Sequence, residues 1–173
     1  GRPGTEEVGV MLFTAVLVVA TALAALVGRR ASWRDRARWG LAVAMAVAGA
    51  SHLLSPAPFL AHLPPWTPLP ELIVVVSGVV EIAFGAALLA PARWRPLVGR
   101  ALAVFFVAVL PANVYVAVAG VDVPGQPGGL YPWLRIPFQA LFIAWVLWST
   151  AQPATPVAEA QEEPEAVACA SAS

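Results

Sequence analysis

The amino-acid sequence predicts an all-α membrane protein, and both its composition and its pattern support this fold class. Hydrophobic residues make up 60% of the 173 residues, charged residues make up 12%, and the mean hydropathy is +0.77, which is too apolar for a soluble domain of this size. The apolar residues form continuous runs, whereas the strands of a transmembrane β-barrel would alternate. Five windows are long enough to cross a bilayer as helices: Val8–Gly28, Trp39–Leu54, Leu69–Ala90, Leu97–Ala119 and Leu134–Thr150.

The arginines predict how these helices cross the membrane. All ten basic residues are arginine, and eight of them lie in the connections after the first and the third span: Arg29, Arg30, Arg34, Arg36, Arg38, Arg93, Arg95 and Arg100. Positively charged connections stay in the cytoplasm, so we expect the N-terminus outside and the C-terminus inside. The formal net charge of zero argues against nucleic acid as a partner.

The two ends of the chain predict an added helix and a tail. In residues 1–38, two glutamates precede the first apolar run and five arginines follow it, which is unlike a cleaved signal peptide, so we expect a retained transmembrane helix with an Arg-rich cytoplasmic connection. Residues 151–173 combine proline, alanine and glutamate without periodicity and predict a disordered cytoplasmic tail. The single cysteine, Cys169, lies in this tail and cannot form a disulfide within the chain.

The second span ends at His52, and a proline-rich stretch follows it. Residues 55–70 hold six prolines and predict an ordered lid or interfacial loop, anchored by Phe59 and Trp66, rather than a regular helix. His52 lies at the membrane edge and is a candidate site residue. His62 lies within the loop, where a histidine more often has no role.

The third span carries a carboxylate, Glu81, about halfway along its apolar run. A charged residue at the centre of a span costs roughly 2.5–3.5 kcal/mol on insertion scales, so Glu81 should face protein or a water-filled cavity. Ser77, Gly78 and Gly85 lie three or four residues from Glu81 and therefore share its face. Small residues at such positions predict that another helix packs closely there.

The last two spans each contain a proline and a polar side chain. Pro111 should kink the fourth span, and Asn113 either satisfies the carbonyl freed at Val107 or faces a ligand. In the fifth span, Arg135 and Gln139 are four residues apart and share a face. Pro137 is harmless there if it lies in the first turn.

The polar side chains fall in one layer when the outer ends of the spans are set level. With a rise of 1.5 Å per residue, Glu81 lies about 15 Å below the outer boundary and Asn113 and Gln139 about 7 Å below it. These depths predict an outward-opening pocket with Arg135 at its mouth and Glu81 at its floor. The predicted ligand-binding residues are His52, Ser77, Glu81, Asn113, Arg135 and Gln139. The sequence contains no phosphate-binding loop, nucleophile elbow or paired Cys/His spacing, so it identifies no catalytic residue and predicts no metal site.

At these residues, the chain resembles the DoxX-like family of small bacterial integral membrane proteins. The resemblance covers residues 39–150 and rests on a histidine ending a span, a proline-rich loop and the motifs SGVVEIAFG, LPANVY and LRIPFQ. It implies a DoxX-like four-helix transmembrane bundle in the bacterial inner (cytoplasmic) membrane, to which the first span is an added N-terminal helix. It also implies an association with quinone-linked sulfur or thiol oxidation.

Three functions follow from these predictions. The first is an accessory or quinone-associated subunit of a redox system, in which the pocket binds a quinone or another lipophilic molecule beside a redox partner protein. The second is a membrane oxidoreductase in its own right, in which Glu81 and His52 relay protons. The third is a structural or assembly protein whose polar residues only hold helices together.

Overall fold

The computed structural model describes residues 9–27, 31–124, 126 and 128–151, and within these ranges the protein is helical and has no strand. The elements are α1 (Gly9–Val27), α2 (Trp33–Leu54), α3 (Ala57–Leu60), α4 (Pro70–Ala87), the short 3₁₀ helix η1 (Ala92–Trp94), α5 (Arg95–Ala119) and α6 (Tyr131–Thr150). The prediction of an all-α protein is confirmed. The predicted tail beyond Ala151, with Cys169, and the arginines at 29 and 30 lie outside the described residues.

Among the described residues, three helical segments are long and apolar enough to cross a membrane: Trp33–Leu54, Pro70–Ala87 and Ala92–Ala119. These correspond to the second, third and fourth predicted spans. In the first predicted span, the apolar helical segment is Ala15–Leu26, which is shorter than these three. The last predicted span corresponds to the helix α6. The helices therefore suggest a membrane protein.

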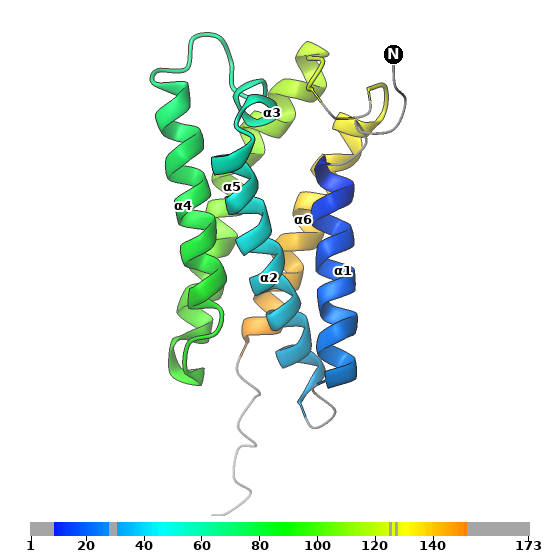
Figure 1. The fold of residues 1–173 in the computed structure, drawn as a ribbon, viewed down its shortest axis with the longest axis vertical. Coiled ribbons are helices and arrows are strands. Elements are labelled where there is room, and N and C mark those ends of the chain that lie inside the picture. Colours follow the sequence, from blue (N-terminus) through cyan, green and yellow to red (C-terminus); the bar gives the residue numbers. More distant parts are fainter. Residues whose placement is uncertain (1–8, 28–30, 125, 127, 152–173) are drawn as a thin grey trace, which may run out of the picture.

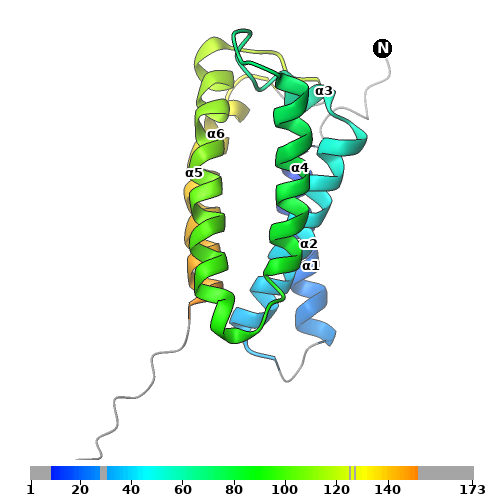
Figure 2. The ribbon, with the colours of Figure 1, turned by 90° about the vertical axis from the view of Figure 1, so that its left-hand side faces the viewer.

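The five long helices run in alternating directions along one axis (Figure 1). α2 packs extensively against both α1 and α4, and α5 packs extensively against α6, whereas α4 and α5 touch little. Figure 2 shows α4 and α5 as separate columns. We call the end with the α1–α2 and α4–α5 connections the arginine end, and the end with the α2–α4 and α5–α6 connections the loop end.

α2 begins at Trp33 rather than at the predicted Trp39. The hydroxyl of Ser32 accepts a hydrogen bond from the backbone N–H of Asp35 and caps the helix. Because this capping signal precedes the apolar run, the helix includes polar residues that the sequence analysis assigned to a connection. Arg34, Arg36 and Arg38 therefore lie on the first turns of α2.

The carboxylate of Asp35 joins the two arginine-containing segments. Its Oδ1 atom lies 2.6 Å from Nη2 of Arg38 and 3.3 Å from Nη1 of Arg95, at the start of α5. Arg34 also donates to the carbonyl of Ala151, after α6. These contacts bring the described arginines of both connections to the same end of the bundle, as the sequence predicts.

The close packing predicted beside Glu81 is confirmed, and the neighbouring helix is α2. A Cβ atom on Gly49 would collide with the carbonyl oxygen of Gly78, and one on Gly78 would lie 2.7 Å from the Cβ atom of His52. A Cβ atom on Gly85 would lie 2.9 Å from the carbonyl oxygen of Ala42. Only glycine allows the backbones of α2 and α4 to approach this closely.

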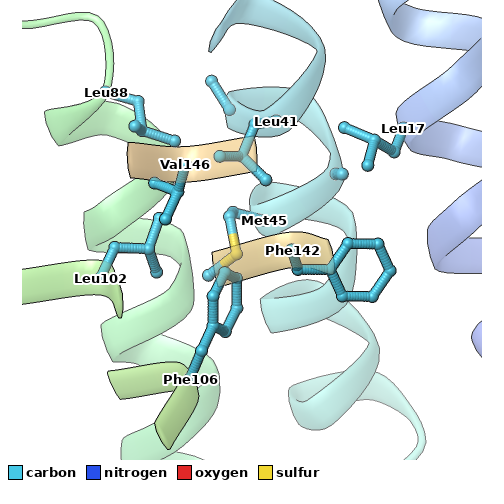
Figure 3. Packing of buried hydrophobic residues seen from close by; sticks show 10 residues of the cluster. Leu17, Leu41, Met45, Leu88, Leu102, Phe106, Phe142 and Val146 are labelled. Carbon is cyan, nitrogen blue, oxygen red and sulfur yellow. The ribbon is translucent and has the colours of Figure 1, made fainter. Parts of the chain in front are cut away.

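The apolar core lies toward the arginine end and is built from α1, α2, α5 and α6 and from Leu88, which follows α4. It is formed by Leu17, Leu41, Ala42, Ala44, Met45, Leu88, Leu102, Phe106, Phe142 and Val146. Figure 3 shows how these side chains pack. Toward the loop end this core gives way to polar side chains and to the site described below.

Two prolines, Pro111 and Pro137, lie inside helices. α5 continues through Pro111 from Arg95 to Ala119. Pro137 does not lie in the first turn, because α6 already begins at Tyr131 and its first turn holds Pro132 instead. Pro137 is therefore an interior proline that leaves the carbonyl of Trp133 without its helical partner.

Candidate functional site

A cavity of about 660 Å³ lies among α2, α4, α5 and α6, near the loop end. All six residues that the sequence predicts as ligand-binding line it: His52, Ser77, Glu81, Asn113, Arg135 and Gln139. They come from four helices and are separated by as much as 87 positions, from 52 to 139, so the fold brings them together. The structure places them around one space, and their role in binding stays a prediction.

Most of the cavity wall is apolar. Phe105 and Phe106 line it from α5, Phe142 from α6 and Met45 from α2. Met45, Phe106 and Phe142 also belong to the packed core, so the core closes the cavity on the side of the arginine end. A volume of this size and a mostly apolar wall with a few polar groups are typical of sites for small organic ligands.

His52 and Glu81 meet on the α2–α4 wall of the cavity. Nδ1 of His52 lies 2.8 Å from Oε2 of Glu81, and both side chains are largely buried. The two atoms are close but poorly aligned, and neither has a well-formed hydrogen bond among the described residues. The expectation that Glu81 faces protein rather than lipid is therefore confirmed, and its partner comes from the last turn of α2.

The serine hydroxyls on the same two helices are directed to their own backbones. Ser77 donates to the carbonyl oxygen of Val74 over 2.9 Å, and Ser51 donates to that of Val47 over 2.8 Å. Both serines line the cavity. A hydroxyl whose hydrogen is used in this way still presents oxygen lone pairs as acceptors.

On the opposite wall, Asn113 and Gln139 form a relay between α5 and α6. Nδ2 of Asn113 donates to Oε1 of Gln139 over 3.2 Å, and Nε2 of Gln139 donates to the carbonyl oxygen of Phe106 over 2.7 Å. The sequence analysis offered Asn113 as the group that satisfies the carbonyl freed by Pro111, at Val107. In the structure the amide that reaches the α5 backbone belongs instead to Gln139, and it binds the neighbouring carbonyl.

At the loop end, Arg135 holds the two loops that cover the cavity. Its Nη1 atom lies 2.7 Å from Nε2 of His62, in the α2–α4 connection, and donates to Oε1 of Gln126, in the α5–α6 connection, over 2.6 Å. Arg135 was expected at the mouth of the pocket. It lies at the mouth and hydrogen-bonds to both loops, so it also stabilises the position of these loops.

These contacts determine the tautomer of His62. A guanidinium can only donate, so Nε2 of His62 accepts from Arg135 and the ring proton sits on Nδ1, 2.6 Å from the carbonyl oxygen of Pro58. The pKa of His62 is lowered from the usual 6.5 to about 4, mainly because burial penalises the charged ring and further because Arg135 is positive; the bond to Pro58 opposes the shift. His62 is thus neutral at pH 7.

Sequence reasoning underrated His62 and missed Gln126. Both line the cavity, but both lie in loops, and their contact with Arg135 depends on loop conformations that no periodicity predicts. The one signal that pointed to His62 was its place in a proline-rich stretch expected to be ordered.

The proline-rich stretch is an ordered cover, as predicted, and it includes the short helix α3. The ring of Phe59 meets that of His52 edge-on, with centroids 3.7 Å apart. Trp66 packs against Tyr115 of α5, with centroids 5.9 Å apart. Phe59 therefore anchors the loop to the cavity, and Trp66 anchors it to the helix on the far side.

The described residues contain no group of three or more His, Cys, Asp or Glu side chains that could hold a metal ion. The histidine and carboxylate groups already described can hydrogen-bond and exchange protons, and the amide groups can hydrogen-bond.

Comparison with known proteins found one family. Residues 41–150 match the model of a family described as a domain of unknown function (DUF8561). The matched region begins inside α2 and ends with α6, so it contains every residue that lines the cavity. Neither the curated proteins nor the solved structures yielded a match.

The lowered pKa of His62 predicts a specific loss of stability in acid. Below pH 6.5 the unfolded chain binds a proton at this histidine and the folded chain does not, so the free energy of unfolding falls as the pH drops from about 6.5 toward about 4. The full effect is about 3 kcal/mol. Melting temperatures of the wild type and of His62→Gln, measured from pH 7 to 4.5, should converge as the pH falls. His52 is present in both proteins, so it contributes equally to both melting curves. Melting temperatures that change in parallel with pH would contradict the lowered pKa of His62.

Proposed function

This chain belongs to the DUF8561 family, and from the geometry of its cavity we propose that it is an integral membrane protein that binds a lipophilic small molecule with a polar head. One observation carries the proposal. Six polar side chains from four helices surround a single cavity whose remaining wall is apolar. A mostly apolar cavity with a few polar groups on its wall is typical of a site that binds a small organic molecule.

The fold that we propose has five membrane spans, with the DoxX-like four-helix bundle formed by α2, α4, α5 and α6 and with α1 added. Exposed tryptophans support two membrane interfaces: Trp33, Trp94 and Trp148 near the arginine end, and Trp66 and Trp133 near the loop end. With the arginine end in the cytoplasm, the N-terminus and the cavity face outward, and the C-terminus faces inward. The proposed location is the bacterial inner membrane.

The DoxX-like resemblance suggests a quinone as the ligand. The corresponding role is an accessory subunit that works beside a redox partner protein. A ring-shaped apolar body suits a cavity lined by Phe59, Phe105, Phe106 and Phe142. An oxidoreductase in its own right is the alternative that the His52–Glu81 contact favours, because such a pair can accept and return protons.

The structural alternative accounts for part of the site. Asn113 and Gln139 hydrogen-bond to one another and to the backbone of α5, which is what residues that hold helices together do. The structural alternative does not account for Glu81, because a carboxylate beside a cavity costs stability. The glycine packing already holds α4 against α2 without it. We therefore assign a packing role to the two hydrogen bonds of the amide relay and a binding role to the His52–Glu81 side.

The proposal predicts that a ligand copurifies with the protein and is displaced by filling the cavity. Native mass spectrometry of protein extracted in mild detergent should show an adduct in the wild type. Ala112→Trp, on the cavity wall of α5, should lose it because the indole occupies the space. Ala101→Trp, on the exposed face of the same helix, is the matched control and should keep it. Absence of an adduct in the wild type, or equal adducts in all three proteins, would contradict the proposal.

The proposed orientation predicts that Cys169 is cytoplasmic. A membrane-impermeant maleimide should leave it unmodified in intact spheroplasts and label it after lysis, because the reagent reaches only the outer face. The sequence contains no other cysteine, so no substitution is needed. Labelling before lysis would show that the arginine end faces outward.

A further inference from the structure

The hydrogen-bonding atoms left free on the α2–α4 wall of the cavity are mostly acceptors. The hydroxyl hydrogens of Ser51 and Ser77 are used by the carbonyls of Val47 and Val74, so each serine offers only oxygen lone pairs to the cavity. These serines lie on the same two helices as His52 and Glu81. A ligand atom on this side therefore meets oxygen acceptors.

Glu81 adds a further acceptor, whichever of the pair holds the proton. At 2.8 Å, two lone pairs on Nδ1 of His52 and Oε2 of Glu81 would repel, so one of the two atoms carries a proton toward the other. The remaining carboxylate oxygen, Oε1, then has lone pairs only, and no described residue donates to it. Because Glu81 lines the cavity, this oxygen is available to a ligand.

The opposite wall offers donors. The amide groups of Asn113 and Gln139 each carry two N–H hydrogens, and each group uses one of them in the relay described above. The second hydrogen of each amide has no partner among the described residues. A ligand head between the two walls therefore meets acceptors from α2 and α4, and from α5 and α6 it meets these amide donors together with the side-chain carbonyl oxygen of Asn113.

We infer that the ligand is a neutral lipophilic molecule whose head carries a hydroxyl group, which donates to Glu81 and accepts from the amide wall. This inference rests on the proposed function. A hydroxyl is a donor and an acceptor at once and matches both walls. A head with carbonyl oxygens only, such as an oxidised quinone, offers no hydrogen-bond donor to Glu81, and a carboxylate head offers none either.

The test compares two probes that differ only in the donor: 4-heptylphenol and its methyl ether, 4-heptylanisole. Binding of each to the purified full-length protein in nanodiscs is measured by titration calorimetry and corrected for partition into empty nanodiscs. We expect the phenol to bind about tenfold more tightly, because the ether cannot donate to Glu81 and leaves this buried acceptor unpaired. Glu81→Gln, which keeps the shape of the side chain, should reduce this preference severalfold. Glu71→Gln, an exposed acid at the start of α4 outside the cavity, is the matched control and should not change it.

The outcomes separate this inference from the proposed function. Equal affinities of the two probes for the wild type would overturn the inference and leave a cavity that binds lipophilic molecules. A preference for the phenol that is the same in Glu81→Gln and in the wild type would also overturn it, since the hydroxyl would then bind elsewhere. Binding of neither probe would count against the proposed function itself.

Discussion

A carboxylate in the middle of an apolar helix needs a polar partner inside the protein, and the rest of this structure depends on how Glu81 obtains one. Its partner is His52, at 2.8 Å, in the last turn of a different helix. The two side chains can meet only because α2 and α4 approach until the Cβ positions of Gly49 and Gly78 are sterically closed. Helix packing and the polar site are therefore one feature: glycine contacts bring the backbones together, and the histidine and carboxylate meet beside them.

The same arrangement explains why a cavity exists. α2 and α4 are drawn tightly together, α5 and α6 are joined by the Asn113–Gln139 relay, and α4 touches α5 only slightly. Toward the arginine end the space between the two helix pairs is filled by the apolar core, and toward the loop end it is lined by polar groups and covered by loops that Arg135 joins. The packed core therefore lies toward the arginine end and the cavity toward the loop end, so we expect substitutions on the cavity wall to cost less stability than substitutions in the core.

Much of this could be predicted from the sequence, for identifiable reasons. Continuous apolar runs locate the helices, and the depth of each polar residue along its run was enough to expect His52, Glu81 and Gln139 around one space. What could not be predicted depends on local signals or loops. The start of α2 is set by the cap at Ser32, within an arginine-rich segment that hydropathy assigns to a connection. The roles of His62 and Gln126 arise only when two irregular loops meet at Arg135.

The central claim is that His52 and Glu81 act as one buried unit, and a double-mutant cycle on unfolding free energy in detergent tests it most directly. The cycle compares His52→Leu, Glu81→Leu and the double variant with the wild type. Each single change leaves one polar group buried without its partner, so the account predicts that the double variant is more stable than the sum of the two losses by about 1–3 kcal/mol. That coupling exceeds the roughly 0.6 kcal/mol of an average interhelical hydrogen bond in a membrane. Additivity within about 0.5 kcal/mol would show that the two residues are only neighbours and would contradict the account.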